Sequence, residues 1–218
     1  MRAVLFDFDG VIVQSELVHK KTFLELLSRY GIEISNRRWY REFAGTGSRH
    51  IFKVLVRENG INENVDELVE RRKKIYEARV RAGEVKETKG ARELLLALQK
   101  KGIKCAIVSG SHRSNVELTL SVLGLGEFFD LIVSGDDLKQ RKPDPGPFLH
   151  AAKKLGFRPD ECIVIEDSYP GCEAGKRAGM KVVWIRPQAN ADASMEPPEC
   201  DLAIDDFRGL KIEQIESL

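Results

Sequence analysis

Acidic side chains stand at the ends of two apolar runs that lie far apart in the sequence. Asp7 and Asp9 close the first run, and Glu166 and Asp167 follow the fourth. Several carboxylates gathered at one point repel one another and require a cation. Hard oxygen ligands of this kind favour Mg²⁺, which keeps several waters and shares its coordination shell with a phosphate. The residue types therefore predict a magnesium site suited to phosphoryl transfer.

The first acidic pair has a spacing that suits two different catalytic roles. A carboxylate beside a metal ion can attack phosphorus, because the cation offsets the repulsion between the two negative groups. We expect Asp7 to be this nucleophile, through an aspartyl-phosphate intermediate. Asp9, two residues further on, is then placed to act as general acid and base.

Two further strand ends carry groups that suit phosphate oxygens. Ser109 and Gly110 follow the second apolar run, at the start of an expected helix. Lys142, in the loop after the third run, offers a compact positive charge to the transferring group. Each feature alone is commonly a helix cap or a solvated loop charge. Their joint occurrence at successive strand ends favours a catalytic site.

The elements that position these residues follow from the apolar pattern. Short runs rich in Val, Ile and Leu, with little alternation, predict strands buried on both faces. We expect strands at 3–8, 104–108, 131–133, 162–165 and 181–185, and a short strand and a last helix after Leu202. We expect helices between the strands at 91–101, 113–123, 146–155 and 171–178. This alternation predicts an α/β fold with a Rossmann-like parallel sheet, whose ligands bind at the carboxyl ends of the strands.

Residues 15–85 break the alternation and contain no strong strand. Helical patterns cover most of this stretch, at 16–30, 36–44, 48–58 and 63–82. We therefore expect residues 1–14 and 86–218 to form an α/β core domain. An α-helical cap domain at 15–85 would be inserted after the first strand.

Composition narrows the class of protein. The chain of 218 residues is 42% hydrophobic and 32% charged, with a net charge of +1, so it lacks the basic field of a nucleic-acid-binding protein. It has no apolar stretch long enough for a membrane span, and its four cysteines form no CxxC pair. We expect a cytoplasmic protein that binds a small phosphorylated metabolite, without nucleic-acid or membrane partners. We expect a monomer, although the sequence does not determine the oligomeric state.

The four motifs together resemble the haloacid dehalogenase superfamily, in its phosphatase and β-phosphoglucomutase-like branch. The matching segments are Asp7-Phe8-Asp9-Gly10, Val108-Ser109-Gly110-Ser111, Lys142-Pro143-Asp144 and Glu166-Asp167-Ser168. The resemblance covers essentially the whole chain, including the helical cap. Asp9 favours phosphate transfer over dehalogenation, because the dehalogenase branch lacks this second aspartate.

The resemblance implies roles for the motif residues. Asp7 would be phosphorylated and would also bind Mg²⁺, and Asp9 would offer its backbone carbonyl to the metal. Asp167, with Glu166 directly or through water, would complete the metal site. Gln14 departs from the family pattern, which usually has Asp at this position near the cap hinge.

The cap is expected to supply substrate specificity. His19 lies on an apolar helical stripe, where it is either a core residue or, as in relatives, a functional one. Gly45 and Arg49 belong to a glycine turn that enters a helix, and relatives place a substrate loop here. Lys73 borders the apolar stripe of the last cap helix, so we expect it to face the substrate cleft.

Two enzyme activities share this active-site core. We expect a phosphatase of small phosphomonoesters, such as sugar phosphates, which would hydrolyse the aspartyl-phosphate. The alternative is a β-phosphoglucomutase-type enzyme, which would return the phosphate to a sugar. Phosphoglycolate is another candidate substrate. A non-catalytic binding protein on the same fold is a remote alternative, because such a protein would be expected to have lost the acidic residues.

Overall fold

The computed structural model describes residues 1–43, 46–187 and 196–218. The chain divides into two compact units. The first, here called the core unit, contains Met1–Gln14 and Lys86–Leu218, and the second, the helical unit, contains Ser15–Val85.

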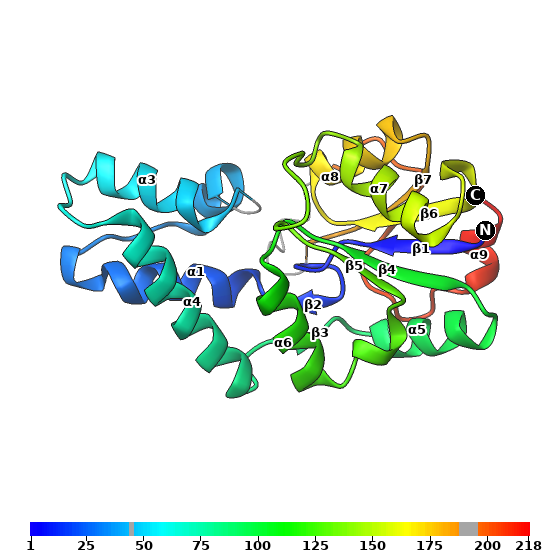
Figure 1. Ribbon diagram of the computed structural model, residues 1–218, viewed down its shortest axis with the longest axis horizontal. Helices are drawn as coiled ribbons and strands as arrows, with labels where there is room; N and C mark the ends of the chain where they lie inside the picture. Colours follow the sequence, from blue (N-terminus) through cyan, green and yellow to red (C-terminus); the bar gives the residue numbers. More distant parts are fainter. Residues whose placement is uncertain (44–45, 188–195) are drawn as a thin grey trace. The chain divides into compact units, whose positions relative to one another are not determined.

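A six-stranded parallel sheet forms the centre of the core unit (Figure 1). Its strands, in spatial order, are β5 (Leu131–Val133), β4 (Lys104–Val108), β1 (Ala3–Phe6), β6 (Cys162–Glu166), β7 (Lys181–Ile185) and β8 (Leu202–Ile204). The α/β fold class with a parallel sheet is thus confirmed. The strand order changes direction beside β1, the type of position where open α/β sheets bind their ligands.

Helices cover both faces of this sheet (Figure 1). The helices of the core unit are α5 (Ala91–Lys100), α6 (Arg113–Leu123), α7 (Gly146–Leu155), α8 (Tyr169–Arg177) and α9 (Ile212–Glu216). Phe148 of α7 and Cys172 of α8 pack with Leu5 and Trp184 of the sheet in one buried cluster. The central strands are buried on both faces, which explains their continuous apolar sequence.

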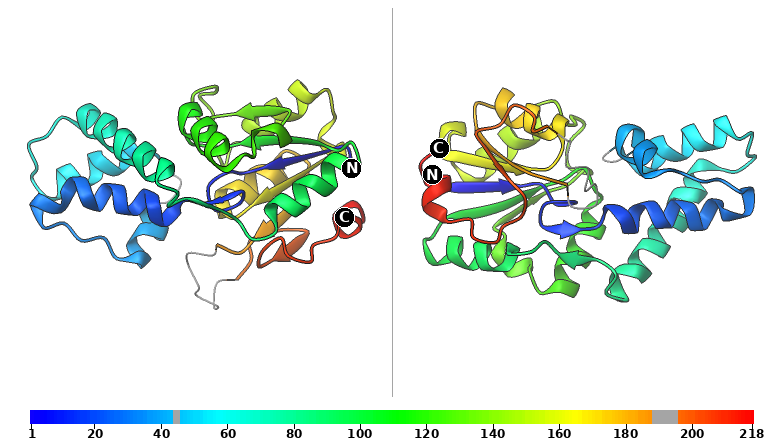
Figure 2. Two further views of the ribbon diagram at one scale, coloured as in Figure 1. Left: turned by 90° about the horizontal axis from the view of Figure 1, so that it is seen from below. Right: turned by 180° about the vertical axis from the view of Figure 1, so that it is seen from behind.

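The strands begin and end close to their expected positions, with one informative difference. β1 ends at Phe6 rather than at residue 8. The amide of Asp7 still donates to Ile165, but the amides of Ile12 and Val13 fold back onto the carbonyl of Phe8. The chain therefore turns just after Asp7, and this turn presents the first acidic pair at the sheet edge. The N-terminus and α9 lie at the opposite end of β1 (Figure 2).

A two-stranded antiparallel ladder, absent from the sequence analysis, marks the boundary of the core unit. β2 (Val13–Gln14) pairs with β3 (Lys86–Glu87). The side-chain amide of Gln14 donates to Thr88 Oγ1 at 2.8 Å and to the Gly10 carbonyl at 3.3 Å. Gln14 thus fastens the strand that leaves the core unit to the residues that re-enter it.

The helical unit has its own hydrophobic core. Its α-helices are α1 (Glu16–Leu27), α2 (Asn36–Arg38), α3 (Ser48–Glu58) and α4 (Val65–Arg81). The expected helix at 36–44 is a short α-helix followed by a π-helical turn over Trp39–Phe43, and residue 44 lies outside the described residues. The ring of Phe23 packs against those of Trp39 and Phe52, with centroid separations of 5.5 and 4.7 Å, respectively. None of the described helices has both the length and the apolarity that crossing a bilayer demands.

Candidate active site

Lys142 joins three strand ends at the carboxyl edge of the sheet. Its ammonium group forms ion pairs with Asp7, after β1, and with Glu166 Oε1, the latter at 2.5 Å. It also donates to the carbonyl of Val108, the last residue of β4, at 2.9 Å. The lysine is mostly buried, with 14% of its side chain exposed. A single cation therefore holds two carboxylates from neighbouring strands close together.

The electrostatics of this cluster are set by burial and by opposite charges. Burial raises the pKa of Asp7, Lys142 opposes the rise, and Glu166 and Asp9 add to it. Burial alone would lower the pKa of Lys142, but Asp7 and Glu166 raise it above its ordinary value. At Asp7 burial therefore outweighs the positive charge of Lys142, and a further cation beside it would favour the charged carboxylate.

Glu166 is fully buried, and both of its carboxylate oxygens have partners. Oε1 accepts from Lys142, and Oε2 accepts from the amide and the hydroxyl of Ser168, each at 2.9 Å. As placed, Glu166 holds Lys142 and the start of α8. This arrangement fits a contact to metal through water better than a direct one.

Asp9 and Asp167 lie next to this ion-pair cluster. Asp9 accepts a 2.5 Å hydrogen bond from the hydroxyl of Ser111. Gly10 has a φ of +89°, and a Cβ on it would lie 2.8 Å from the carboxyl carbon of Asp167. A side chain at position 10 would therefore collide with Asp167, and glycine allows the first and fourth motifs to approach closely.

The segment Ser109–Ser111 forms a tight turn after β4. Ser109 is buried, donates its amide to Val133 at 2.9 Å, and accepts the Ser111 amide on its hydroxyl at 3.0 Å. The first amide of α6, that of Arg113, donates to Asp136 at 2.8 Å and is therefore not free for a phosphate. Phosphate binding here would depend on the Ser109 hydroxyl and the turn at Gly110.

The donor set at this edge fits Mg²⁺. Within residues 1–43, 46–187 and 196–218, no three Asp, Glu, His or Cys side chains converge as a complete metal shell. The candidate ligands are instead hard oxygens from Asp7, Asp167 and the backbone near Asp9, and Gly10 allows the first motif to approach Asp167 closely. Mg²⁺ suits such a partial shell because it retains waters and takes a phosphate oxygen.

The helical unit contains a buried cationic cluster around His19. The His19 ring stacks on Tyr76, with centroids 4.3 Å apart and an interplanar angle of 9°. Its Nδ1 contacts the Arg72 guanidinium, which also donates to Ser48 at 2.8 Å and lies 4.5 Å from the Phe23 ring centroid. Arg72 has only 6% of its surface exposed. Arg72 is not among the residues expected to be functional, although its position four residues before Tyr76 on α4 places it on the same helical face.

The other candidates in the helical unit have different surroundings. Lys73 is half-buried, whereas Lys74 is exposed, as the helical stripe predicts. Arg49 forms an exposed ion pair with Asp66. Gly45 lies outside the described residues.

Comparison with known proteins agrees with this geometry. Residues 4–185 match the family model described as haloacid dehalogenase-like hydrolase. The chain is 32% identical to pyrophosphatase PpaX of Bacillus velezensis, over 89% of each chain. It is 30% identical to the phosphorylated carbohydrates phosphatase of Thermotoga maritima, over 84% of each chain.

A solved structure supports the same relationship. The β-phosphoglucomutase of Clostridium difficile superposes with a TM-score of 0.83 at 25% identity, covering 100% of this chain and 96% of that one. The family resemblance of the four motifs is therefore confirmed. The chain belongs to the haloacid dehalogenase-like hydrolases and has the fold of that family's phosphatases and phosphomutases.

Proposed function

We propose that the protein is a Mg²⁺-dependent phosphatase of small phosphomonoesters, such as sugar phosphates, with Asp7 as its nucleophile. The observation that carries the proposal is the Lys142 ammonium between Asp7 and Glu166, beside an Asp9 oriented by Ser111. Lys142 holds the Asp7 carboxylate in one orientation and places positive charge where a phosphoryl group would approach.

In the first half-reaction, a carboxylate oxygen of Asp7 attacks phosphorus and the bond from phosphorus to the leaving oxygen breaks. Asp9 enters this step protonated and gives its proton to that leaving oxygen. Lys142 and Ser109 bind the phosphoryl oxygens during transfer. The products are the free alcohol and phosphorylated Asp7.

In the second half-reaction, Asp9 is a carboxylate and takes a proton from a water that attacks the phosphorus. The bond between phosphorus and Asp7 breaks, which releases inorganic phosphate and restores the carboxylate. Asp9 is again protonated, so the cycle balances. The hydrogen bond from Ser111 keeps Asp9 in position through both steps.

Mg²⁺ would be held by Asp7, Asp167 and, following the family resemblance, the backbone carbonyl of Asp9, with Glu166 reaching it through water. When bound, it neutralises the repulsion between Asp7 and the phosphate. Lys142 contacts two carboxylates, but the buried surroundings of Asp7 contain further ones. A metal ion would balance this remaining negative charge, which supports the assignment.

A phosphomutase is the second candidate, supported by the structural likeness to β-phosphoglucomutase. Phosphoglycolate also remains a candidate substrate. We favour hydrolysis because the two relatives described above are named as a pyrophosphatase and a phosphatase, and both names denote hydrolases.

The test is phosphate release from a panel of sugar phosphates, phosphoglycolate and nucleotides with Mg²⁺, for wild type and Asp7→Asn. We expect release from at least one substrate, and a loss of at least about 10³-fold in kcat for the variant. Asp160→Asn, at an exposed position, is the matched control and should retain wild-type activity. Normal turnover in Asp7→Asn would contradict the nucleophile assignment. Isomerisation of β-glucose 1-phosphate without phosphate release would instead support the mutase.

A further inference from the structure

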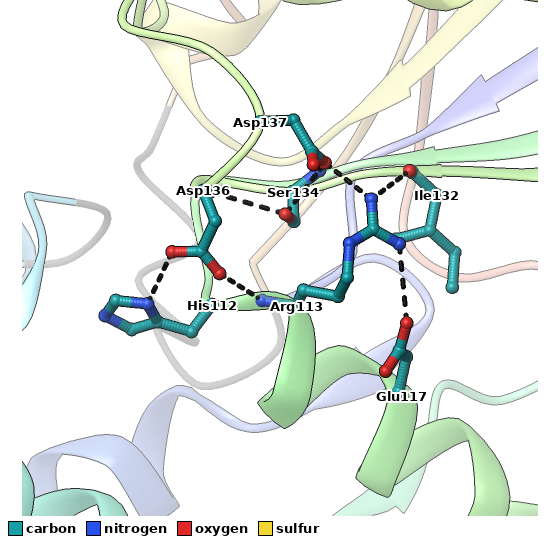
Figure 3. Close-up of polar contacts among 7 residues, drawn as sticks. All are labelled: His112, Arg113, Glu117, Ile132, Ser134, Asp136 and Asp137. Atoms are coloured by element: carbon teal, nitrogen blue, oxygen red, sulfur yellow. Dashed lines mark hydrogen bonds and ion pairs between the residues drawn. The ribbon is translucent and has the colours of Figure 1, made fainter.

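We propose that Asp136 and Asp137, in the turn after β5, are positioning residues that hold Ser109–Ser111 in place through His112 and Arg113. We call these two aspartates, together with His112 and Arg113, the clamp. The inference rests on the proposed function, in which Ser109–Ser111 binds the transferring phosphoryl group. Figure 3 shows the clamp and its hydrogen bonds.

Ser111 connects the phosphate-binding turn to the acid/base residue. Its hydroxyl donates to Asp9 at 2.5 Å, its amide donates to Ser109 Oγ at 3.0 Å, and its carbonyl accepts from Gly135 at 2.8 Å. A displacement of Ser111 would therefore disturb both the phosphate cradle and Asp9. The position of Ser111 depends in turn on the next two residues, His112 and Arg113.

Asp136 holds the start of α6 from a different loop. Its carboxylate accepts the amide of Arg113 at 2.8 Å and contacts His112 Nδ1 at 2.7 Å (Figure 3). His112 is the N-cap residue but makes no side-chain cap hydrogen bond. Asp136 thus satisfies a free helix amide that a local Ser or Asp would ordinarily satisfy.

Asp137 anchors the side chain of Arg113 to the end of β5. It accepts from the guanidinium at 2.6 Å, and from the amide and hydroxyl of Ser134 at 2.6 and 2.8 Å. The same guanidinium donates to the carbonyl of Ile132 at 2.9 Å. Burial alone would raise the pKa of Asp137, but the hydrogen bonds from Ser134 and Arg113 bring it below its ordinary value. Both clamp carboxylates are therefore hydrogen-bonded to groups of the protein and are not available to a substrate.

The two turns also touch directly through their backbones. A Cβ on Gly135 would lie 2.9 Å from the carbonyl carbon of Gly110. Because the two backbones are this close, the β5 turn and the phosphate-binding turn have little room to move relative to each other. A shift of the clamp is therefore transmitted to Gly110 and Ser111, and a displacement of about 1 Å in a catalytic constellation can cost about 100-fold in rate.

The test compares Asp136→Asn and Asp137→Asn with Asp130→Asn, a matched control. Asp130 also links β4 to β5, by accepting from Lys104 and from the amide of Cys105 at 2.6 and 3.0 Å. Lys104 and Cys105 begin β4, so this link lies at the end of the strand away from Ser109. The control removes the same type of contact between the same strands without touching the phosphate-binding turn.

We expect each clamp variant to lose about tenfold in kcat relative to Asp130→Asn, with KM changed by less than about threefold. Arg113→Lys, which keeps the charge that Asp137 binds, should retain more kcat than Arg113→Met. If a clamp variant fails to fold, His112→Asn removes one exposed contact and should reduce kcat in the same direction. A kcat within threefold of the Asp130→Asn value, or an effect confined to KM, overturns the proposal.

Hydrogen exchange separates this proposal from the enzymatic assignment. The amides of residues 109–111 should exchange faster in the clamp variants than in Asp130→Asn, whether or not the substrate is known. Unchanged exchange would show that the clamp does not hold the turn. Absence of phosphate release by the wild type would refute the proposed function and leave the exchange comparison valid.

Discussion

At the scale of single residues, Lys142 allows the carboxylates of the candidate site to lie close together. Two carboxylates on neighbouring strand ends, Asp7 and Glu166, would repel each other in a buried site. The ammonium between them offsets this repulsion and also reaches the Val108 carbonyl. The residue proposed to stabilise the transferring phosphoryl group is therefore also the residue that allows the carboxylates to assemble.

In the helical unit, the first residue-scale prediction concerns Arg72 and its neighbour Lys73. We expect Arg72→Ala to lower the free energy of unfolding of the helical unit by about 2–3 kcal/mol. The variant loses buried hydrogen bonds to His19 and Ser48 and the contact with Phe23. Lys73→Ala, at a half-buried position, should change the free energy of unfolding by less than about 0.5 kcal/mol.

Urea unfolding followed by the fluorescence of Trp39 measures this difference. Trp39 is buried in the helical unit, and a Trp184→Phe background removes the signal of the other tryptophan. Equal losses for the Arg72 and Lys73 variants would show that the buried cluster does not depend on Arg72.

At the scale of elements, one edge of the sheet is fastened by a partly buried aspartate. Asp201, just before β8, accepts from the amide of Val182 at 2.8 Å, from Lys176 at 2.9 Å and from Lys181 at 3.1 Å. One carboxylate thereby joins β8 to β7 and to the end of α8. Burial alone would raise the pKa of Asp201, but these hydrogen bonds and the two lysines bring it below its ordinary value.

The lowered pKa predicts a pH-dependent contribution to stability. Because the folded pKa lies below the unfolded one, the contribution is present above the unfolded pKa and is lost as pH falls through the folded pKa. Asp201→Asn should therefore lower stability by about 1–2 kcal/mol at pH 7. The difference from wild type should shrink as the pH falls below about 4.

Thermal unfolding of both proteins from pH 7 to pH 3 measures this effect. Asp160→Asn is the control, because that carboxylate is largely exposed and its ion pair contributes little. A difference between Asp201→Asn and wild type that stays constant with pH would contradict the assignment.

At the scale of the whole molecule, we expect activity to need Mg²⁺ while folding does not. The sheet and the helical unit each have an apolar core, and Lys142 forms ion pairs with both Asp7 and Glu166. Chelation should abolish turnover and lower the melting temperature by only a few degrees. Added Mg²⁺ should restore activity, whereas Ca²⁺, with longer bonds and looser geometry, should not.

The experiment is a phosphate-release assay and a thermal melt on one chelated sample, before and after each ion is added. Full turnover after chelation would contradict the metal dependence. Global unfolding on chelation would show instead that the metal is structural.

Much of this architecture could be predicted from the sequence, because its signals are local. Buried parallel strands have continuous apolar sequences, and the strands and α-helices from β4 to β7 lie within two residues of their expected bounds. The carboxyl ends of parallel strands share one edge, so Asp7, Ser109, Lys142 and Glu166 could be assigned to one site. The β2–β3 ladder was missed because two-residue strands carry no periodic signal.

Side-chain partners were decided only by the tertiary structure. The acidic motif at Asp7 determined the type of chemistry, but nothing local shows that Lys142 would bind Asp7 and Glu166 together. In the sequence, Asp136 and Asp137 resemble ordinary turn residues. Their contacts with Arg113 exist only because the β5 turn packs against the start of α6. The physical reason is that secondary structure follows from the pattern of neighbouring residues. A buried charge is instead stabilised by whichever distant group the packed elements bring within hydrogen-bonding distance.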